Sequence, residues 1–305
     1  MKRFYKEGYP NHVYSKGVDG NMVFYSTADC IYYITLYFCL SRRHRIRTSA
    51  FSLMPNHTHS QQQAPDRKAF ISFNQKMASV FTRGYNIQHN REGELFQKPF
   101  GSAPKAGEKS VRNNLSYICN NGAAGNLSKG VTDYRWNLMA YYCKDHPYSE
   151  KIILAKASHR LRNALRYVDQ LNEEEKPLGY KVQRMLFKGL NKKERLQLTD
   201  YIITKYNFLD YSLTVKLFGT FDKAIEGMNA HTGSEHDLKE EWEDYSEYRR
   251  MIEMAGREGL DMESVSFEKM DRETLLGLVK KLSRASRDSR KILRFIGRGK
   301  EVADR

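Results

Sequence analysis

The sequence predicts an α+β fold with one antiparallel sheet, followed by an all-helical region. In the first 150 residues, segments with alternating apolar residues are interleaved with segments of helical spacing, whereas strand patterns disappear after about residue 150. With 305 residues, of which 40% are hydrophobic, the chain can bury a sizeable core in one large domain or two smaller ones. A disordered or fibrous chain is therefore excluded.

The first expected elements are two short strands and a helix. Residues 12–25 read as two strands around a Val-Asp-Gly-Asn turn, because Asp-Gly readily adopts positive φ. Residues 27–40 have the pattern of a helix, with Thr27 or Asp29 available near its start as a cap.

A third strand and a second helix are expected next. Residues 45–54 alternate like a strand that continues through residues 55–60, and Pro55 favours a sheet edge or a bulge there. Residues 67–85 show helical spacing of apolar side chains, and Gly84 is expected to close this helix.

The remaining elements complete the α+β pattern and begin the helical region. Residues 93–104 are expected to form another strand, and residues 108–122 a helix that stops at Gly122. Residues 158–171 and 191–206 are amphipathic helices by their spacing.

The positive charge of the chain is concentrated in two places. The formal net charge is +15 and the pI is near 9.5. Residues 1–150 carry a net +10 and residues 275–305 a net +7, whereas residues 151–274, which include the acidic run 235–247, carry −2. This balance favours a polyanionic partner such as nucleic acid or an anionic membrane surface.

The sequence indicates a cytoplasmic protein, associated with the nucleoid if it is bacterial. The first ten residues lack the apolar segment of a signal peptide, and no apolar run is long enough to span a membrane. The four cysteines lie far apart without CxxC spacing, as in a reduced cytosolic protein: Cys30, Cys39, Cys119 and Cys143.

Two pairs of residues suggest phosphodiester chemistry. His57 and His59 are two apart in a predicted strand, so both imidazoles leave the same face and could hold one divalent metal, although a lone His-x-His is often an ordinary polar strand face. Tyr117 and Asn121 share one helical face and offer a phenol nucleophile and an amide oxygen. A free phenol has a pKa of about 10, so a metal and basic neighbours would be needed to favour the phenolate.

Other tyrosines and histidines are expected to have other roles. His12 and His44 are expected at the surface or on phosphate, and His89 in solvent. Four further tyrosines of this half are expected to be packing residues: Tyr85, Tyr134, Tyr141 and Tyr142.

Basic residues near the proposed site and in the C-terminal segment are candidates for DNA contact. The first set is Arg42, Arg43, Arg45, Arg47, Lys98, Lys105, Lys109 and Arg112. The second set is Lys280, Lys281, Arg284, Arg287, Arg290 and Arg294. The second set lies in two short expected helices around residues 283–286, within a segment of about 266–299 that could form a helix-turn-helix or simply a basic helical hairpin.

Three motifs resemble the REP-associated tyrosine transposases, the single-tyrosine branch of the HUH (His-hydrophobic-His) nucleases. They are LMPNHTH at 53–59, GELFQKPF at 93–100 and LSYICNNG at 115–122. Residues 12–24 and 133–136 are also similar to the start and end of that family's domain, and the resemblance covers roughly residues 5–145. The chain departs from the family pattern in three places. Thr58 stands where a hydrophobic residue is usual, and the polar run Ser60-Gln61-Gln62-Gln63 stands where an apolar strand end is usual. Gly122 stands where a proline is common.

The resemblance implies a ferredoxin-like catalytic domain, here over residues 1–148, with residues 149–305 as the helical region. It implies cleavage of single-stranded DNA beside hairpins with Mg²⁺ or Mn²⁺, and attachment of the 5′ phosphate to tyrosine. His57 and His59 would then be metal ligands, Tyr117 the nucleophile and Asn121 the third ligand. The alternative is a catalytically inactive, domesticated DNA-binding regulator on the same fold. A monomer and a homodimer are both compatible with the sequence.

Overall fold

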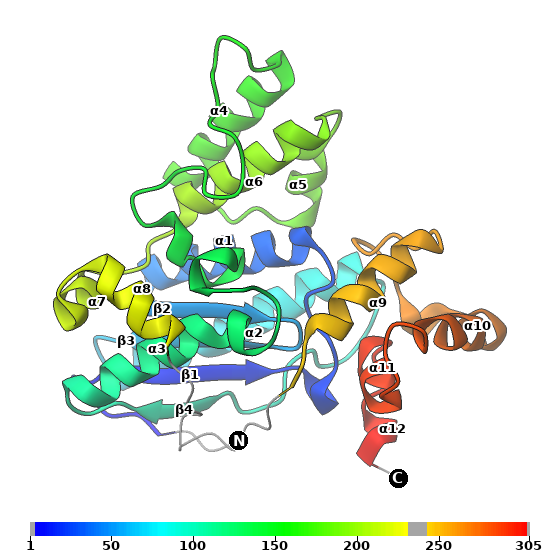
Figure 1. Cartoon of the computed structure of the whole chain (residues 1–305), viewed down its shortest axis with the longest axis horizontal. Coiled ribbons are helices and arrows are strands. Elements are labelled where there is room, and N and C mark those ends of the chain that lie inside the picture. The colour runs from blue at the N-terminus through cyan, green and yellow to red at the C-terminus, as the bar shows by residue number, and fades with distance from the viewer. Residues whose placement is uncertain (1–3, 231–242, 304–305) are drawn as a thin grey trace.

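The first half of the chain follows the order βαββαβα (Figure 1). The computed structural model describes residues 4–230 and 243–303, so most of the acidic run 235–247 lies outside the described residues. The elements of this half are β1 (Asn11–Lys16), α1 (Thr27–Arg43), β2 (Arg47–Met54), β3 (His57–Gln63), α2 (Arg67–Gln88), β4 (Gly101–Pro104) and α3 (Glu108–Ala124).

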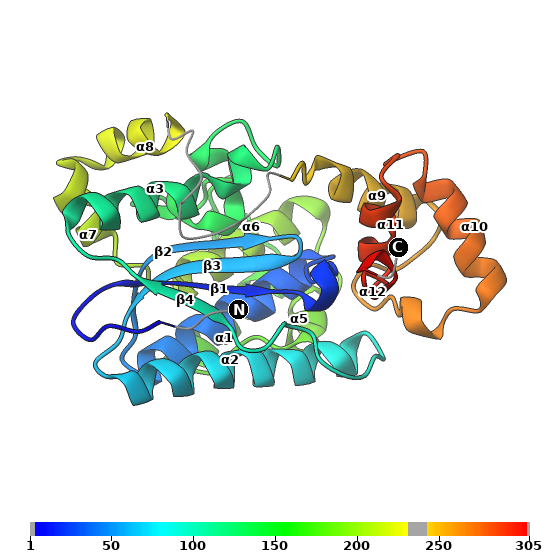
Figure 2. The same ribbon diagram turned by 90° about the horizontal axis from the view of Figure 1, so that it is seen from below.

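The four strands form one sheet in the order β2-β3-β1-β4. Neighbouring strands are all antiparallel, which is the arrangement of a ferredoxin-like sheet. Helices α1 and α2 cover one face and α3 lies on the other (Figure 2). The expected α+β fold with a ferredoxin-like antiparallel sheet is therefore confirmed, and β3, which carries the two motif histidines, is a central strand.

The expected hairpin over residues 12–25 is wrong in its second half. A short 3₁₀ turn, Val18–Gly20, follows β1, and Asp19 and Gly20 have positive φ as expected. The chain then leaves the sheet, because the backbone N–H groups of Val23 and Phe24 donate to the carbonyl of Pro55 instead of a strand partner.

The helix that follows is capped by the residue before those expected. Ser26, rather than Thr27 or Asp29, is the N-cap of α1, and Asp29 completes a capping box with it.

The strand expected over residues 45–60 is in fact two strands, β2 and β3, joined by a tight turn at Pro55 and Asn56. The expectation of a sheet edge at Pro55 is therefore wrong: the proline sits in the turn, where no ladder N–H is required of it. Of the strand expected over residues 93–104, only β4 forms.

Gly84 and Gly122 lie inside α2 and α3 and do not end them. Both expected stops are wrong for the same reason, because each glycine makes room for an aromatic ring. A Cβ at Gly84 would lie 2.6 Å from the Tyr32 ring, and one at Gly122 would lie 2.3 Å from the Tyr134 ring.

After residue 148 the described elements are helical, as expected. They are α4 (His159–Glu173), α5 (Tyr180–Phe187), α6 (Lys192–Tyr206), α7 (Tyr211–Phe218), α8 (Phe221–Asn229), α9 (Ser246–Arg257), α10 (Arg272–Leu282), α11 (Ser289–Phe295) and α12 (Lys300–Ala303). None of the helices described is both long and apolar enough to cross a bilayer.

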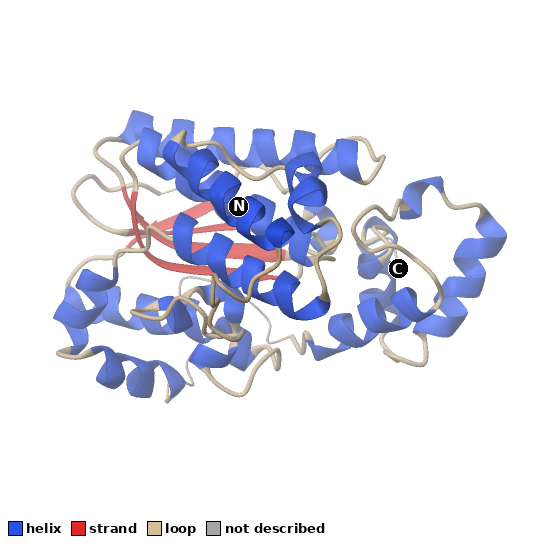
Figure 3. Ribbon diagram, turned by 90° about the horizontal axis from the view of Figure 1, so that it is seen from above, coloured by secondary structure: helices blue, strands red, loops and turns tan. Residues whose placement is uncertain are grey.

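The later helices pack around the first half in three groups. Helices α4 to α6 cover α1, and Ile31 and Cys39 of α1 share a hydrophobic core with them. Helices α7 and α8 lie against α3. Helices α9 to α12 gather at one end of the molecule (Figures 2 and 3). This last group is joined to the first half by Tyr25, whose hydroxyl donates to the carbonyl of Phe295.

Candidate functional site

One strand and one helix bring the predicted histidines and tyrosine together. The rings of His57 and His59 leave the same face of β3, with centroids 4.7 Å apart. The Tyr117 ring, on α3, lies 5.6 Å from that of His59. Thr58 between the histidines points to the opposite face, where its hydroxyl bonds to that of Tyr33 on α1. The site therefore lies on the α3 side of the sheet.

His12 is a third histidine of this site, and the expectation of a surface position is wrong. It is 1% exposed, and its Nε2 lies 2.9 Å from Nδ1 of His59. Its ring centroid is 5.7 Å from that of Tyr117. Sequence spacing could not reveal this, because it depends on the register that places β1 beside β3.

Tyr14 is a second tyrosine close to the histidines. It pairs with His59 across the sheet, and their ring centroids are 6.3 Å apart. A Cβ at Gly101 on β4 would lie 2.0 Å from the Tyr14 ring, so only a glycine leaves room for the ring there. Tyr14 is therefore the natural comparison for Tyr117 in any test of the nucleophile.

The two motif histidines are held through their Nδ1 atoms. Nδ1 of His57 donates to the side-chain oxygen of Asn56 at 2.6 Å, and Nδ1 of His59 contacts His12. Hydrogen bonds of this kind fix the ring orientation and tautomer of metal-binding histidines. Nε2 is thus the atom that each ring would present to a cation.

The tyrosine helix is fixed to the sheet by buried hydrogen bonds. Asn114 on α3 donates to Gln61 at 2.6 Å, and Gln61 donates to Ser49 on β2 at 2.9 Å. On the other face, Gln62 and Asn74 of α2 exchange hydrogen bonds of 2.9 and 3.1 Å. The polar side chains at the end of β3 therefore find their hydrogen-bond partners inside the protein.

Asn121 lies one helical turn after Tyr117, and its Nδ2 is buried without a hydrogen-bond partner in the part of the chain that the structure describes. An amide N–H donor in that situation fits an incoming acceptor such as a phosphate oxygen, whereas a metal would need the side-chain oxygen of Asn121. The described residues include no group of three or more His, Cys, Asp and Glu side chains that could hold a metal. Two imidazoles with an amide oxygen fit Mn²⁺ or Mg²⁺ as a partial ligand set, completed by water or phosphate oxygen.

The other candidate tyrosines are held by partners outside this group. Burial raises the pKa of the Tyr85, Tyr134 and Tyr141 phenols well above the ordinary value. The hydroxyls of Tyr134 and Tyr141 donate to the Leu53 carbonyl and the Asp200 carboxylate. Tyr142 stacks on Phe221 at 3.9 Å.

His44 and His89, also considered in the sequence, differ in their surroundings. His44 is half-buried, and burial together with nearby Lys76 lowers its pKa. The expectation of a solvated His89 is wrong: its ring is buried and contacts Asp29 at 3.1 Å and the Val265 carbonyl at 3.1 Å.

The structure does not bring the arginine cluster to the site. Arg42 and Arg43 pair with Glu175, and Arg47 pairs with Asp210 at the end of β2 remote from His57. Arg45 is exposed in the turn before β2.

The basic residues near the tyrosine helix differ in their exposure and in their partners. Lys98 pairs with Glu94, and Lys105 is 2% exposed rather than a surface contact. Lys109 and Arg112 are exposed on α3 itself.

The C-terminal basic residues are mostly exposed. Lys280, Arg284 and Arg287 are exposed and have no ion pair within the described ranges. Three others pair with carboxylates: Lys281 with Glu258, Arg290 with Asp288 and Arg294 with Glu243. The two short helices expected around residues 283–286 are α10 and α11.

Comparison with known proteins finds a structural match. No protein-family model matches the chain, and no curated protein matches it significantly. A solved structure of a REP-associated tyrosine transposase bound to a REP hairpin is similar, with 18% sequence identity and a TM-score of 0.39. The match covers 45% of this chain and 79% of that one. At this level of similarity, function has to be inferred from the residues of the site.

Proposed function

We propose that this protein is a divalent-metal-dependent endonuclease and strand transferase that acts on single-stranded DNA beside hairpins through a 5′-phosphotyrosine intermediate. The observation that supports it is the gathering of His57, His59 and Tyr117 on one face of the sheet, within 5.6 Å between neighbouring ring centroids. The sequence resemblance to the single-tyrosine HUH nucleases names the same three residues.

The tyrosine supplies the covalent chemistry. The Tyr117 oxygen attacks phosphorus, a bond from phosphorus to the phenol oxygen forms, and the bond to the 3′ oxygen breaks. The phenol gives up its proton and the departing 3′ oxygen gains one. Since the new linkage is still a phosphodiester, the reverse reaction with another 3′ hydroxyl rejoins the strand without an energy source.

The histidines and Asn121 supply a metal position beside the tyrosine. His57 and His59 would bind Mg²⁺ or Mn²⁺ through Nε2, and Asn121 through its side-chain oxygen. The bound ion would polarise the phosphate and favour the phenolate. His12 and Asn56 would keep the two imidazoles oriented.

Exposed cations would hold the DNA backbone. Lys109 and Arg112 lie on the tyrosine helix, and Lys280, Arg284 and Arg287 lie on the C-terminal helices. Contacts with phosphate from such residues would make binding strongly dependent on salt.

A covalent-adduct assay tests the proposal. The protein is incubated with labelled single-stranded hairpin DNA and Mn²⁺, and an adduct that survives SDS is expected. Tyr117→Phe should abolish the adduct, whereas Tyr14→Phe, which removes a neighbouring phenol, should retain it. No adduct with any hairpin taken from around the native gene would contradict the proposal. Retained hairpin binding without an adduct would instead favour the inactive DNA-binding regulator.

A further inference from the structure

A cavity of about 670 Å³ lies on the side of α1 turned away from the sheet. It is bounded by the start of α1, the end of α2, α5 with the loop after it, and the first half of α6. Because the His57 and Tyr117 site is on the opposite face of the sheet, the cavity is separate from it. Its volume is that of a typical small-molecule site.

The lining of this cavity is strongly basic. Five cations line it against a single carboxylate, that of Glu263: Arg135, Arg184, Lys188, Lys192 and Arg195. Like charges gathered around one concave space repel one another and favour a bound anion.

Most of this positive charge is not neutralised by the protein. Arg135 pairs with Asp200 at 3.3 Å, and Arg195 lies 3.9 Å from Glu263. Lys188 and Lys192 have no ion pair within the described residues, and Arg184 donates only to the amide oxygen of Gln88. Three cations of the lining are thus left to an incoming ligand.

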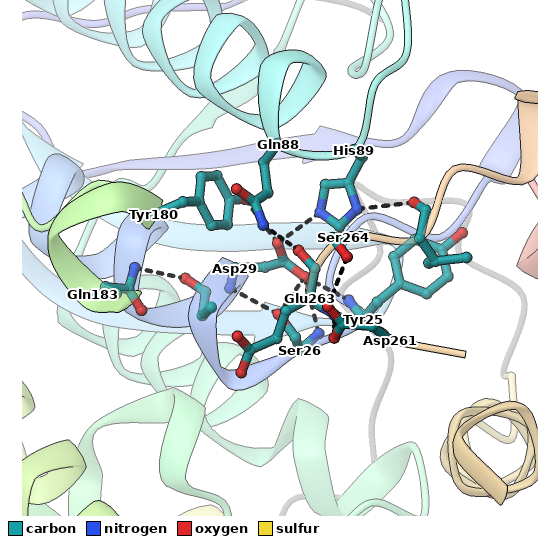
Figure 4. Close-up of polar contacts among 12 residues, drawn as sticks. Tyr25, Ser26, Asp29, Gln88, His89, Tyr180, Gln183, Asp261, Glu263 and Ser264 are labelled. Carbon is teal, nitrogen blue, oxygen red and sulfur yellow. Dashed lines mark hydrogen bonds and ion pairs between the residues drawn. The ribbon is translucent and has the colours of Figure 1, made fainter. Parts of the chain in front are cut away.

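The start of α1 borders the same cavity. Thr27 and Ala28 line the cavity at the positive end of this 17-residue helix. The one carboxylate of that turn, Asp29, is fully buried and turned inward, where it accepts from the Tyr180 hydroxyl at 2.7 Å and contacts His89 (Figure 4). This carboxylate caps the helix start from inside the protein, so the positive potential of the cavity comes from its cationic side chains rather than from the helix end.

The rest of the wall is made of neutral polar side chains, among them Gln88 and Gln183, and of apolar ones. Ile31, Phe187 and Leu196 line the cavity, and Leu196 is 42% exposed although it is a large hydrophobic residue. A ligand that carries both phosphates and a flat apolar part would match the cations and this wall at the same time. Nucleotides have that chemistry.

We propose that this cavity binds a nucleotide, with its phosphates on Lys188, Lys192 and Arg184 and its base on Phe187 and Leu196. The lining residues come from several segments around one concave space, so they can contact a small ligand from several sides. A DNA duplex is too wide to enter this space and could contact the same residues from one side only. The site is independent of the DNA-cleaving site proposed above.

Calorimetric titration with ATP and with inorganic tripolyphosphate, at fixed ionic strength, tests the proposal. We expect ATP to bind more tightly than tripolyphosphate, and the Lys188→Gln/Lys192→Gln protein to bind ATP at least ten-fold more weakly. Lys156→Gln/Lys181→Gln is the matched control, since it removes the same charge from two exposed lysines outside the lining. This control and Tyr117→Phe should bind ATP like the unmodified protein.

Four results would overturn the proposal, and the first three come from the titrations. They are no ATP binding, equal weakening in the two double variants, and tripolyphosphate binding as tight as ATP binding. Displacement of ATP by hairpin DNA would likewise show that the cations serve a nucleic-acid surface. Because all measurements can be made on Tyr117→Phe protein, failure here is distinguishable from failure of the proposed DNA cleavage.

Discussion

The side-chain amide of Asn114 donates a 2.6 Å hydrogen bond to the amide oxygen of Gln61, and this bond joins the tyrosine helix to the histidine strand. Asn114 lies three residues before Tyr117, and Gln61 lies two residues after His59. Both amides are fully buried. Because Asn114 is about one helical turn from Tyr117, this bond fixes the position of the phenol relative to the imidazoles.

Removal of this bond should impair cleavage more than DNA binding. In Asn114→Ala the buried Gln61 oxygen loses this hydrogen bond, at a cost of about 1–3 kcal/mol in stability. We expect slower formation of the covalent adduct with nearly unchanged hairpin affinity, measured by gel assay and fluorescence anisotropy. Asn113→Ala, at the exposed neighbouring position, is the control. Equal adduct rates in the two variants would contradict a positioning role for Asn114.

His12 should affect metal binding through His59. Its Nε2 lies 2.9 Å from Nδ1 of His59, and loss of such an outer partner typically lowers metal affinity 10- to 100-fold. We expect this loss for His12→Ala in Mn²⁺ titrations followed by electron paramagnetic resonance, with His44→Ala unchanged. If both variants bind Mn²⁺ as the parent does, His12 has no part in holding the metal ligand.

Gly122→Ala should destabilise the protein although alanine is the better helix former. An exposed Gly→Ala change inside a helix stabilises by up to about 1 kcal/mol. At Gly122 the added methyl would lie 2.3 Å from the Tyr134 ring, so α3 or the ring must move. Gly277→Ala in α10 meets nothing within 4 Å and should raise the melting temperature. A stabilising Gly122→Ala would show that the ring yields without cost.

The same glycine illustrates what the sequence could not predict. A glycine after a run of helical spacing is a common C-terminal signal. At Gly84 and Gly122 that signal is misleading, because the missing side chain accommodates an aromatic ring from a distant segment. The helices themselves were predictable, since their apolar spacing is long and regular in α2 and α6.

In the site, too, some residues can be identified from nearby sequence, whereas others depend on how distant segments pair. His57, His59 and Tyr117 could be selected from spacing and motif, because each signal lies within a few residues of sequence. His12 and Tyr14 depend on the register between β1 and β3, which spacing along one strand does not determine. The central place of β3 was hidden by its polar residues, whose partners, such as Asn114 and Asn74, come from other elements.

The four cysteines should react with thiol reagents at very different rates. Burial raises the pKa of Cys39 and of Cys119 to about 12, and it raises the pKa of Cys30 well above its ordinary value. At pH 8 these thiols stay protonated and inaccessible, whereas Cys143 is exposed. Ellman's reagent should therefore titrate one cysteine quickly in the native protein and four after unfolding. The fast phase should vanish in Cys143→Ser, and a second fast cysteine would contradict the buried positions.

Asp29 should be a main determinant of stability because it joins three parts of the chain. Its carboxylate accepts from the Tyr25 and Ser26 backbone N–H groups, from the Tyr180 hydroxyl of α5, and contacts His89 at the end of α2 (Figure 4). His89 in turn reaches the Val265 carbonyl of the C-terminal region.

Asn at position 29 would keep the shape but remove the buried charge. Loss of a charged acceptor from a buried hydrogen-bond network typically costs about 1–3 kcal/mol or more, so Asp29→Asn should lower the urea midpoint. Asp66→Asn makes the same chemical change at the exposed N-cap of α2, where asparagine caps as well as aspartate, and should leave the midpoint nearly unchanged. If the two variants unfold at the same urea concentration, the carboxylate of Asp29 does not hold these segments together.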